Sequence, residues 1–239
     1  MSPKETKTPR TGSEVIVDYF VKQNIPYAIG IPGHGCLGFT DALYRRKDEI
    51  QVVQPKQEQA GVHMAVGYYR VTGRPLPVFT SIGPGALNTA IGLGDAFVDS
   101  MPVLVLTGDT HVHMRGVGVL QEVERKRDSG LPQVLSPLVK RSFELAQADQ
   151  VQKVLQRAFN LMLEGRPGPV HIDMPMDVQC AATAKYTPDP EKHHPKGRIR
   201  GDLQQIEAAA KMLMEAERPV IWLGGGVVAS AAYEEVKKL

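Results

Sequence analysis

Short apolar runs alternate with amphipathic segments along most of the chain, and this pattern predicts a regular succession of strands and helices. The apolar runs predict strands at 27–31, 51–53, 76–81, 102–107 and 169–173. Hydrophobic residues at helical spacing predict helices at 13–24, 36–46, 57–71, 86–97 and 149–164. The run at 102–107 is apolar almost throughout, as in a strand that is buried on both faces of a parallel sheet. The predicted class is therefore α/β, a three-layer αβα arrangement with a mostly parallel sheet.

The same pattern divides the chain into parts. Residues 1–12 are polar and are expected to be a flexible tail that ends before Ser13, the candidate N-cap of the first helix. A first domain is predicted over 13–183, and prolines, histidines and basic residues predict a linker over 184–200. Residues 201–239 then predict a helix at 202–215, a strand at 219–223 and the start of another helix. Two helices and one strand are too few to enclose a hydrophobic core. Residues 201–239 are therefore expected to be the beginning of a truncated second domain.

Composition and charge narrow the kind of partner. The chain has 239 residues, of which 42% are hydrophobic and 23% charged, and its net charge is +2. The first ten residues hold this whole excess, so the rest is neutral, which argues against nucleic acid and membrane surfaces as partners. No apolar run reaches the roughly 18 residues of a membrane span, and the start does not resemble a signal peptide. Cys36 and Cys180 do not make a disulfide framework, so a cytoplasmic location is expected.

A glycine-rich turn follows the first predicted strand. Gly33-His34-Gly35-Cys36-Leu37-Gly38 has the G-x-G-x-x-G spacing of dinucleotide-binding turns, and Glu58 follows 20 residues after the last glycine. Two details oppose this interpretation: Gln54 stands where the acid should end the second strand, and Pro32 stands where the turn should begin. A plain tight turn and a turn that lines a pocket are the other interpretations.

Two further strand ends carry small or polar residues, the Gly83-Pro84-Gly85 turn and Thr107-Gly108-Asp109. Glu58 either stabilises the start of its helix as a surface acid or lies at the carboxyl edge of the sheet, where open α/β folds bind ligands. Together these strand ends predict one crevice. His111 and His113 could share a face as metal ligands, but no cluster of acids or cysteines accompanies them. Loop residues are favoured there, and no metal ligands are predicted.

Four stretches, in this order, resemble the thiamine diphosphate-dependent enzymes, in particular their acetolactate synthase-like branch. They are 57–73 (QEQAGVHMAVGYYRVTG), 83–88 (GPGALN), 95–108 (DAFVDSMPVLVLTG) and 165–170 (GRPGPV). The resemblance covers about 12–178 and then enters a second domain. It implies that 13–183 is a pyrimidine-binding domain with the thiamine diphosphate-binding fold, and that 201–239 begins the central domain of these enzymes.

The resemblance also implies roles for particular residues. Glu58 matches the catalytic glutamate that contacts N1′ of the aminopyrimidine ring of the cofactor. The other implied cofactor-binding residues are Gly33, His34, Gly35, Gly83, Pro84, Gly85 and Asn88. His34, Gln121 and Lys140 match residues of the substrate pocket, and Leu120 stands where acetolactate synthases have a phenylalanine.

The implied activity is that of a lyase or transferase that decarboxylates or joins 2-oxo acids or related dicarbonyl compounds. The implied cofactors are thiamine diphosphate and Mg²⁺, whose ligands are expected in a domain outside this sequence, with FAD as a further candidate. Self-association as a dimer or tetramer is expected, and this chain alone is expected to be inactive. The alternatives are a stand-alone pyrimidine-binding subunit of a split decarboxylase, a non-catalytic module of the same fold, and a Rossmann oxidoreductase that uses the turn at 33–38.

Overall fold

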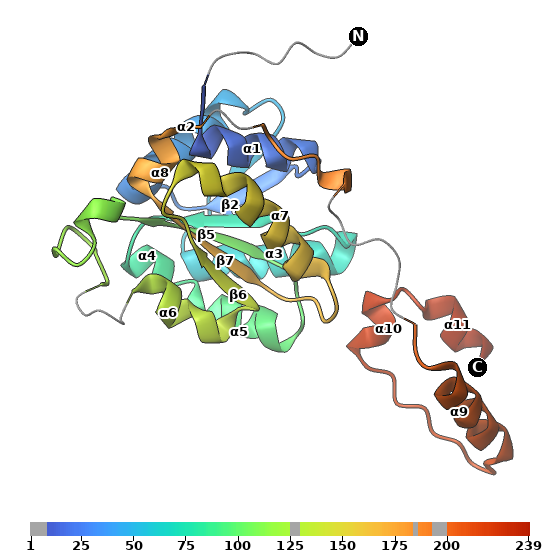
Figure 1. Ribbon diagram of the computed structural model, residues 1–239. Helices are drawn as coiled ribbons and strands as arrows, with labels where there is room; N and C mark the ends of the chain where they lie inside the picture. The colour runs from blue at the N-terminus through green and yellow to red at the C-terminus, as the bar shows by residue number, and fades with distance from the viewer. Residues whose placement is uncertain (1–8, 125–129, 184–185, 193–199) are drawn as a thin grey trace, which may run out of the picture. The chain divides into compact units, whose positions relative to one another are not determined.

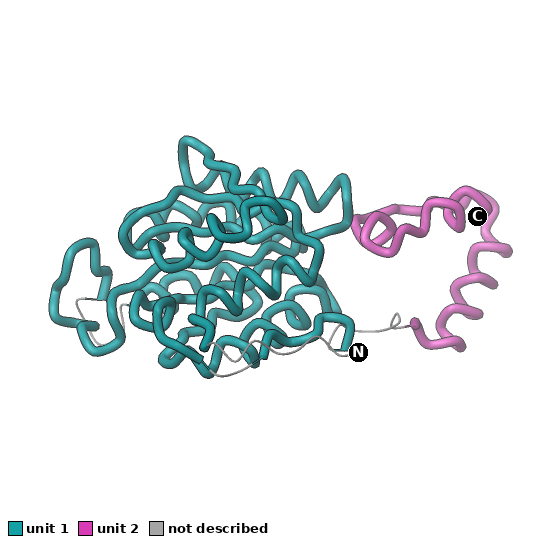
Figure 2. The backbone as a smooth tube through the Cα atoms, turned by 90° about the horizontal axis from the view of Figure 1, so that it is seen from above, with its two compact units in different colours: residues 1–195 teal, residues 196–239 magenta. Residues whose placement is uncertain are grey.

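The computed structural model describes residues 9–124, 130–183, 186–192 and 200–239. The chain divides into two compact units, residues 1–195 and 196–239 (Figure 2). No helix within the described ranges is both long and apolar enough to cross a membrane.

The first unit is built on a six-stranded sheet in the order β3-β2-β4-β5-β7-β6, and all neighbouring strands are parallel. The strands are β2 (Tyr27–Gly30), β3 (Gln51–Val53), β4 (Pro77–Thr80), β5 (Leu104–Asp109), β6 (Arg141–Glu144) and β7 (Val170–Pro175). All residues of β4 and β7 are buried, as expected for strands covered on both faces. The predicted α/β class with a parallel sheet is confirmed.

Helices cover both faces of this sheet. In Figure 1, α1 (Gly12–Lys22), α2 (Leu37–Arg45), α7 (Val151–Leu163) and α8 (Met176–Cys180) lie above it, and α4 (Pro84–Leu87), α5 (Ala90–Val98) and α6 (Leu131–Leu135) lie below. The long helix α3 (Glu58–Thr72) packs against α5, β2 and β4. Short 3₁₀ turns are found at His34–Cys36, Val112–Met114, Ser136–Leu138, Ala148–Gln150 and Pro190–Lys192. Aromatic rings fill the space between the layers, with Phe39 edge-on to Phe79 at 5.5 Å between centroids.

The strand order creates a switch point beside β2. From β2 the chain passes to β3 on one side, and it then returns to form β4 on the other side of β2. The loops that leave the carboxyl ends of β2 and β4 therefore run in opposite directions, and in open α/β sheets the resulting crevice binds ligands. Two of the glycine-rich turns singled out in the sequence, at 33–35 and 83–85, lie at this point.

The N-cap of the first helix lies two residues earlier than the predicted cap at Ser13. Thr11 is the N-cap: its hydroxyl accepts a hydrogen bond from the Glu14 amide at 3.2 Å, and the Glu14 carboxylate accepts one from the Thr11 amide at 2.9 Å. Arg10 and Thr11 also form the short strand β1, which pairs antiparallel with β8 (Ala182–Thr183). Residues 10–12 are therefore part of the fold and not of a flexible tail. Residues 1–8 of the predicted tail lie outside the described residues.

One detail of the predicted helices is wrong. The predicted helix at 86–97 is divided into α4 and α5, and at the junction the Thr89 hydroxyl donates to the Ala86 carbonyl at 2.6 Å. Gly67 is exposed on α3, and a side chain there would meet no atom within 4 Å. Ala65 on the same helix is buried.

Part of the predicted linker packs on the first unit. Thr187, Pro188 and Pro190 are buried, and Thr187 receives hydrogen bonds from Arg10 at 2.9 Å and from Lys22 at 3.0 Å. These prolines end up buried because the segment runs back over α1 and is held there by its polar contacts. Residues 184–185 and 193–199 of the predicted linker, with His193 and His194, lie outside the described residues.

The second unit contains the helices α9 (Leu203–Glu215), α10 (Gly225–Ala229) and α11 (Tyr233–Lys238). The strand predicted at 219–223 is wrong, because these residues form neither a helix nor part of a sheet. Their side chains are exposed, including Val220 at 89% and Trp222 at 93%. A strand needs a neighbour for its backbone hydrogen bonds, and the described part of this unit supplies none.

Candidate functional site

The turns after β2 and β4 pack directly against each other. A β-carbon on Gly33 would lie 2.5 Å from the Ser81 hydroxyl oxygen, and one on Gly35 would lie 2.2 Å from Cγ1 of Ile82. The Gly35 amide donates to that hydroxyl at 3.3 Å. Both glycines are therefore required for close approach of the two turns. This explains the glycine spacing without a dinucleotide, and it places the half-buried His34 between them at the switch point.

Glu58 lies at the same edge of the sheet, where it begins α3 after strand β3. The Asn88 side-chain amide donates to Oε2 of Glu58 at 3.0 Å. The other carboxylate oxygen, Oε1, would be 3.1 Å from a β-carbon on Gly85. The fold thus brings together three residues that were singled out separately in the sequence. One oxygen of the half-buried carboxylate is held by Asn88, and the other faces a space kept free by the absence of a side chain on Gly85.

Gly83 joins this group to the segment after β5. Its backbone has φ +53° and ψ −110°, a conformation that residues with a side chain rarely adopt. A β-carbon here would lie 2.0 Å from the backbone carbonyl oxygen of Gln121. Gln121 also has a positive φ of +64°, and its side chain is exposed. Gln121 therefore reaches the 83–85 turn through its backbone, so it lies beside the cofactor-binding residues that the resemblance implies.

Lys140 is not brought into this group within the chain. Its amide donates to the Pro169 carbonyl at 2.8 Å, and its Nζ donates to the Glu164 carbonyl at 2.7 Å. It lies directly before β6, and since all strands run in parallel, the amino end of β6 is at the edge opposite to Glu58. Partial burial lowers the pKa of the Lys140 ammonium. The placement of Lys140 in a pocket with His34 and Gln121 is therefore not supported within one chain.

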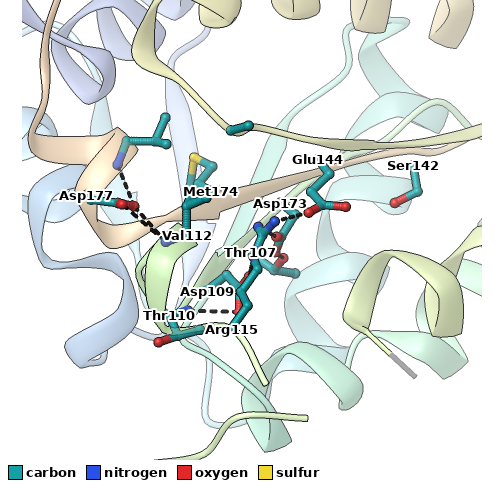
Figure 3. Close-up of polar contacts among 12 residues, drawn as sticks. Thr107, Asp109, Thr110, Val112, Arg115, Ser142, Glu144, Asp173, Met174 and Asp177 are labelled. Carbon is teal, nitrogen blue, oxygen red and sulfur yellow. Dashed lines mark hydrogen bonds and ion pairs between the residues drawn. The ribbon is translucent and has the colours of Figure 1, made fainter. Parts of the chain in front are cut away.

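A buried polar network behind the site was missed in the sequence. Strand register places His171 between Val105 and Ser142, and Asp173 between Thr107 and Glu144. The Thr107 hydroxyl donates a hydrogen bond to Asp173 at 2.9 Å and lies 2.8 Å from Nε2 of His171. The Ser142 hydroxyl lies 2.6 Å from Nδ1 of the same histidine ring. Thr107, Ser142 and Asp173 are labelled in Figure 3. The sequence did carry a signal for this network, because polar residues stand at the alternate positions 171 and 173 of a strand that is otherwise apolar.

The network sets the charge of its buried members. Burial lowers the pKa of His171 to about 3, so the ring is neutral at physiological pH. Since Thr107 donates to Asp173, we assign the ring proton to Nε2, which donates to Thr107, and the lone pair to Nδ1, which accepts from Ser142. Burial and the neighbouring Asp109 carboxylate raise the pKa of Asp173 well above its usual range, and Arg115 partly opposes this.

The neutral His171 ring predicts a pH dependence of stability. Its pKa is lower in the folded chain than the ordinary 6.5, so the unfolded chain binds the proton more readily. Stability attributable to His171 is full above pH 6.5 and falls by about 1.4 kcal/mol per pH unit as the pH is lowered toward 3. Between pH 7 and pH 5, the free energy of unfolding of the wild type should therefore lose about 2 kcal/mol more than that of His171→Gln, which cannot be protonated.

Urea unfolding at both pH values measures this difference. The opposite contribution of Asp173 is present in both proteins and largely cancels in the comparison. The same pH dependence in the wild type and in His171→Gln would show that the ring is not held neutral by burial.

Metal ligands do not gather in this part of the structure. Among the described residues, no group of three or more His, Cys, Asp or Glu side chains could hold a metal ion. The rings of His111 and His113 are 5.5 Å apart between centroids, and His113 lies 3.9 Å from Asp177.

Comparison of the sequence with known families gives the class of protein to which this site belongs. Residues 10–128 match the family described as thiamine pyrophosphate enzyme, N-terminal TPP binding domain. The chain belongs to this family of thiamine pyrophosphate, or thiamine diphosphate, enzymes, and its parallel sheet with helices on both faces is the fold of their pyrimidine-binding domain.

Within the family, the chain is similar to acetolactate synthase large subunits. The probable large subunit of Methanocaldococcus jannaschii is 36% identical over 95% of this chain and 38% of its own length. The isozyme 3 large subunit of Escherichia coli is 33% identical over 95% of this chain and 39% of its own length. The large subunit of Corynebacterium glutamicum is 34% identical over 95% of this chain and 35% of its own length. The chain thus spans less than two fifths of the curated relatives that it matches.

Proposed function

We propose that this chain forms the pyrimidine-binding part of a thiamine diphosphate-dependent enzyme that decarboxylates or joins 2-oxo acids, as in acetolactate synthesis. The observation that carries this proposal is the Glu58 carboxylate, which lies at the carboxyl edge of the sheet with Oε2 bound by Asn88 and Oε1 facing Gly85. Residues 13–183 are proposed as the pyrimidine-binding domain, and 201–239 as the beginning of the central domain.

The residues at the switch point fit an aminopyrimidine ring. Thiamine diphosphate, when bound, supplies a carbon nucleophile and an electron sink for the 2-oxo acid. Glu58 is proposed to hold a proton at the ring nitrogen N1′, which is general acid–base catalysis by a positioned carboxyl group. Asn88 orients this carboxylate, because its hydrogen bond occupies Oε2 and leaves Oε1 for the ring. Gly85 keeps the space beside Oε1 open, and the turns at 33–35 and 83–85 let the backbone approach the cofactor.

His34 and the segment around Gln121 are proposed to face the substrate end of the same site. His34 lies between the two glycines that pack on the Ser81–Ile82 turn, and Gln121 touches Gly83. The diphosphate and its Mg²⁺ are proposed to bind to a part of the enzyme outside residues 1–239, across an interface between subunits of a dimer or tetramer. FAD is a further candidate cofactor, and its site is proposed to lie mostly in the central domain.

The proposal is tested by calorimetry on the complete enzyme and on residues 1–239 alone. We expect the complete enzyme to bind thiamine diphosphate tightly in the presence of Mg²⁺ and to consume pyruvate or another 2-oxo acid. Residues 1–239 alone should bind the cofactor weakly and without dependence on Mg²⁺, because they supply only the pyrimidine side. Tight Mg²⁺-dependent binding to residues 1–239 would contradict the division of the site. A complete enzyme that neither binds the cofactor nor consumes a 2-oxo acid would contradict the proposed function.

A further inference from the structure

Arg115 connects the segment after β5 to three strands of the sheet. Its Nε donates to Asp109 at 2.9 Å, its Nη2 donates to Asp173 at 3.0 Å, and its Nη1 pairs with Glu144 (Figure 3). Asp109 and Glu144 are the last residues of β5 and β6, and Asp173 lies near the carboxyl end of β7. One guanidinium group thus holds the carboxyl ends of three neighbouring strands and fixes the loop to them.

The contacts with Asp109 and Asp173 are not ordinary surface ion pairs. The Arg115 side chain is only 14% exposed, and the Asp173 side chain is fully buried. A planar guanidinium has five donors in a fixed fork, so it can serve three acceptors at once, which a lysine ammonium cannot match in the same geometry. A buried acid without its partner is strongly unfavourable, so the position of Arg115 is well determined.

Glu122 fixes the other end of the same loop. Its carboxylate accepts hydrogen bonds from the backbone amides of Gly116, Gly118 and Val119, the last at 3.0 Å. Glu122 is buried, so the loop from 116 to 122 is folded around its own acid. Since Gly116 directly follows Arg115, the loop cannot shift as a unit without moving Arg115.

The fixed loop ends on the candidate site. Gln121, next to Glu122, places its carbonyl oxygen against Gly83, in the space that a side chain would otherwise occupy. A continuous series of contacts therefore runs from the ends of β5, β6 and β7 through Arg115 and the loop closed by Glu122 to the turn beside Glu58. The geometry of the substrate end depends on where this loop is held.

We propose that Arg115 is a positioning residue for the substrate end of the site: by holding Asp109, Asp173 and Glu144 together it sets the position of the loop that places Gln121 on Gly83. This inference rests on the proposed function, and it assigns to Arg115 no contact with cofactor or substrate. Glu58 and Asn88 are joined by their own hydrogen bond, which involves no residue of this loop, so the inference separates substrate binding from activation of the cofactor.

The test is Arg115→Ala in the complete enzyme with thiamine diphosphate, Mg²⁺ and pyruvate. We expect kcat/KM for the 2-oxo acid to fall about 10- to 100-fold, mainly through KM, because a displacement of about 1 Å in a positioned group has effects of this size. The rate at which the bound cofactor exchanges its C2 proton for deuterium should stay close to the wild-type rate, because Glu58 and Asn88 are unchanged. Added guanidinium ion should restore part of the lost kcat/KM by entering the vacated space.

Arg45→Ala is the matched control, because Arg45 is an exposed arginine that pairs with Asp41 at the far end of α2. It should leave both readouts at wild-type values. If Arg115→Ala does not fold, Arg115→Lys keeps the charge but loses the fork, and it should show the same split between KM and C2 exchange. Hydrogen exchange at the amides of Gly116, Gly118 and Val119 should become faster in either variant, independently of activity.

Three outcomes are distinguishable. A wild-type kcat/KM in Arg115→Ala would overturn the inference. Equal loss of C2 exchange and substrate turnover, without rescue by guanidinium, would also overturn it, because that pattern indicates a purely structural role. A wild-type enzyme that shows neither C2 exchange nor turnover of a 2-oxo acid would instead overturn the proposed function.

Discussion

Glu58→Gln is expected to lower kcat of the complete enzyme about 10²–10⁴-fold, the usual contribution of a positioned acid or base. Glutamine has nearly the same shape and keeps a carbonyl oxygen that can accept the Asn88 hydrogen bond, but it cannot hold and return a proton. The same variant should slow C2 proton exchange by a similar factor while calorimetry still detects cofactor binding. This combination would show that the carboxyl group acts on the cofactor after it is bound.

Glu49→Gln is the matched control for this experiment. Glu49 is an exposed glutamate that pairs with Arg46 shortly before β3, at the opposite end of that strand from Glu58. It should leave kcat and C2 exchange unchanged. Full activity of Glu58→Gln would remove Glu58 from the catalytic role, whatever the family resemblance implies.

Gly83→Ala is expected to have the second largest effect, on both cofactor affinity and stability. A side chain at φ +53° costs about 1–3 kcal/mol of backbone strain. The new β-carbon would also lie 2.0 Å from the Gln121 carbonyl, so either the 83–85 turn or the loop must move away. A shift of the turn displaces Gly85 and Asn88 from Glu58. Affinity for thiamine diphosphate should therefore fall about tenfold or more, since 1.4 kcal/mol corresponds to a factor of ten.

Gly67→Ala provides the opposite result with the same chemical change. Gly67 lies inside α3 with no atom near the place of a β-carbon, so alanine should stabilise the fold by about 0.4–1 kcal/mol. Thermal unfolding and cofactor titration of both variants give the comparison. Equal behaviour of the two alanine variants would show that the Gly83 backbone is not strained by a side chain and that Gln121 does not limit the turn.

Particular elements show how far the sequence could be interpreted. The strands β2, β4, β5 and β7 were predictable because each lies in a short run of mostly apolar residues. Strand β6 was missed, since it lies at the sheet edge and only Phe143 is buried, so its pattern resembles a loop. The run at 219–223 is apolar enough for a strand, yet it has no neighbouring strand among the described residues of its unit. Apolar character predicts burial, but strand pairing depends on what lies alongside.

The sequence by itself determined the α/β class, the glycine turns, Glu58 as the candidate acid and the thiamine diphosphate family, because each depends on local pattern or on a contiguous motif. Only the tertiary structure decided that Asn88 and Gly85 meet Glu58, and that Gln121 contacts Gly83 through its backbone. It also decided that Lys140 lies at the opposite edge of the sheet and that Arg115 joins three strands. The physical reason is that strand order and register determine which distant residues become neighbours. Both follow from packing of the whole sheet and leave no mark on the residues beside any one motif.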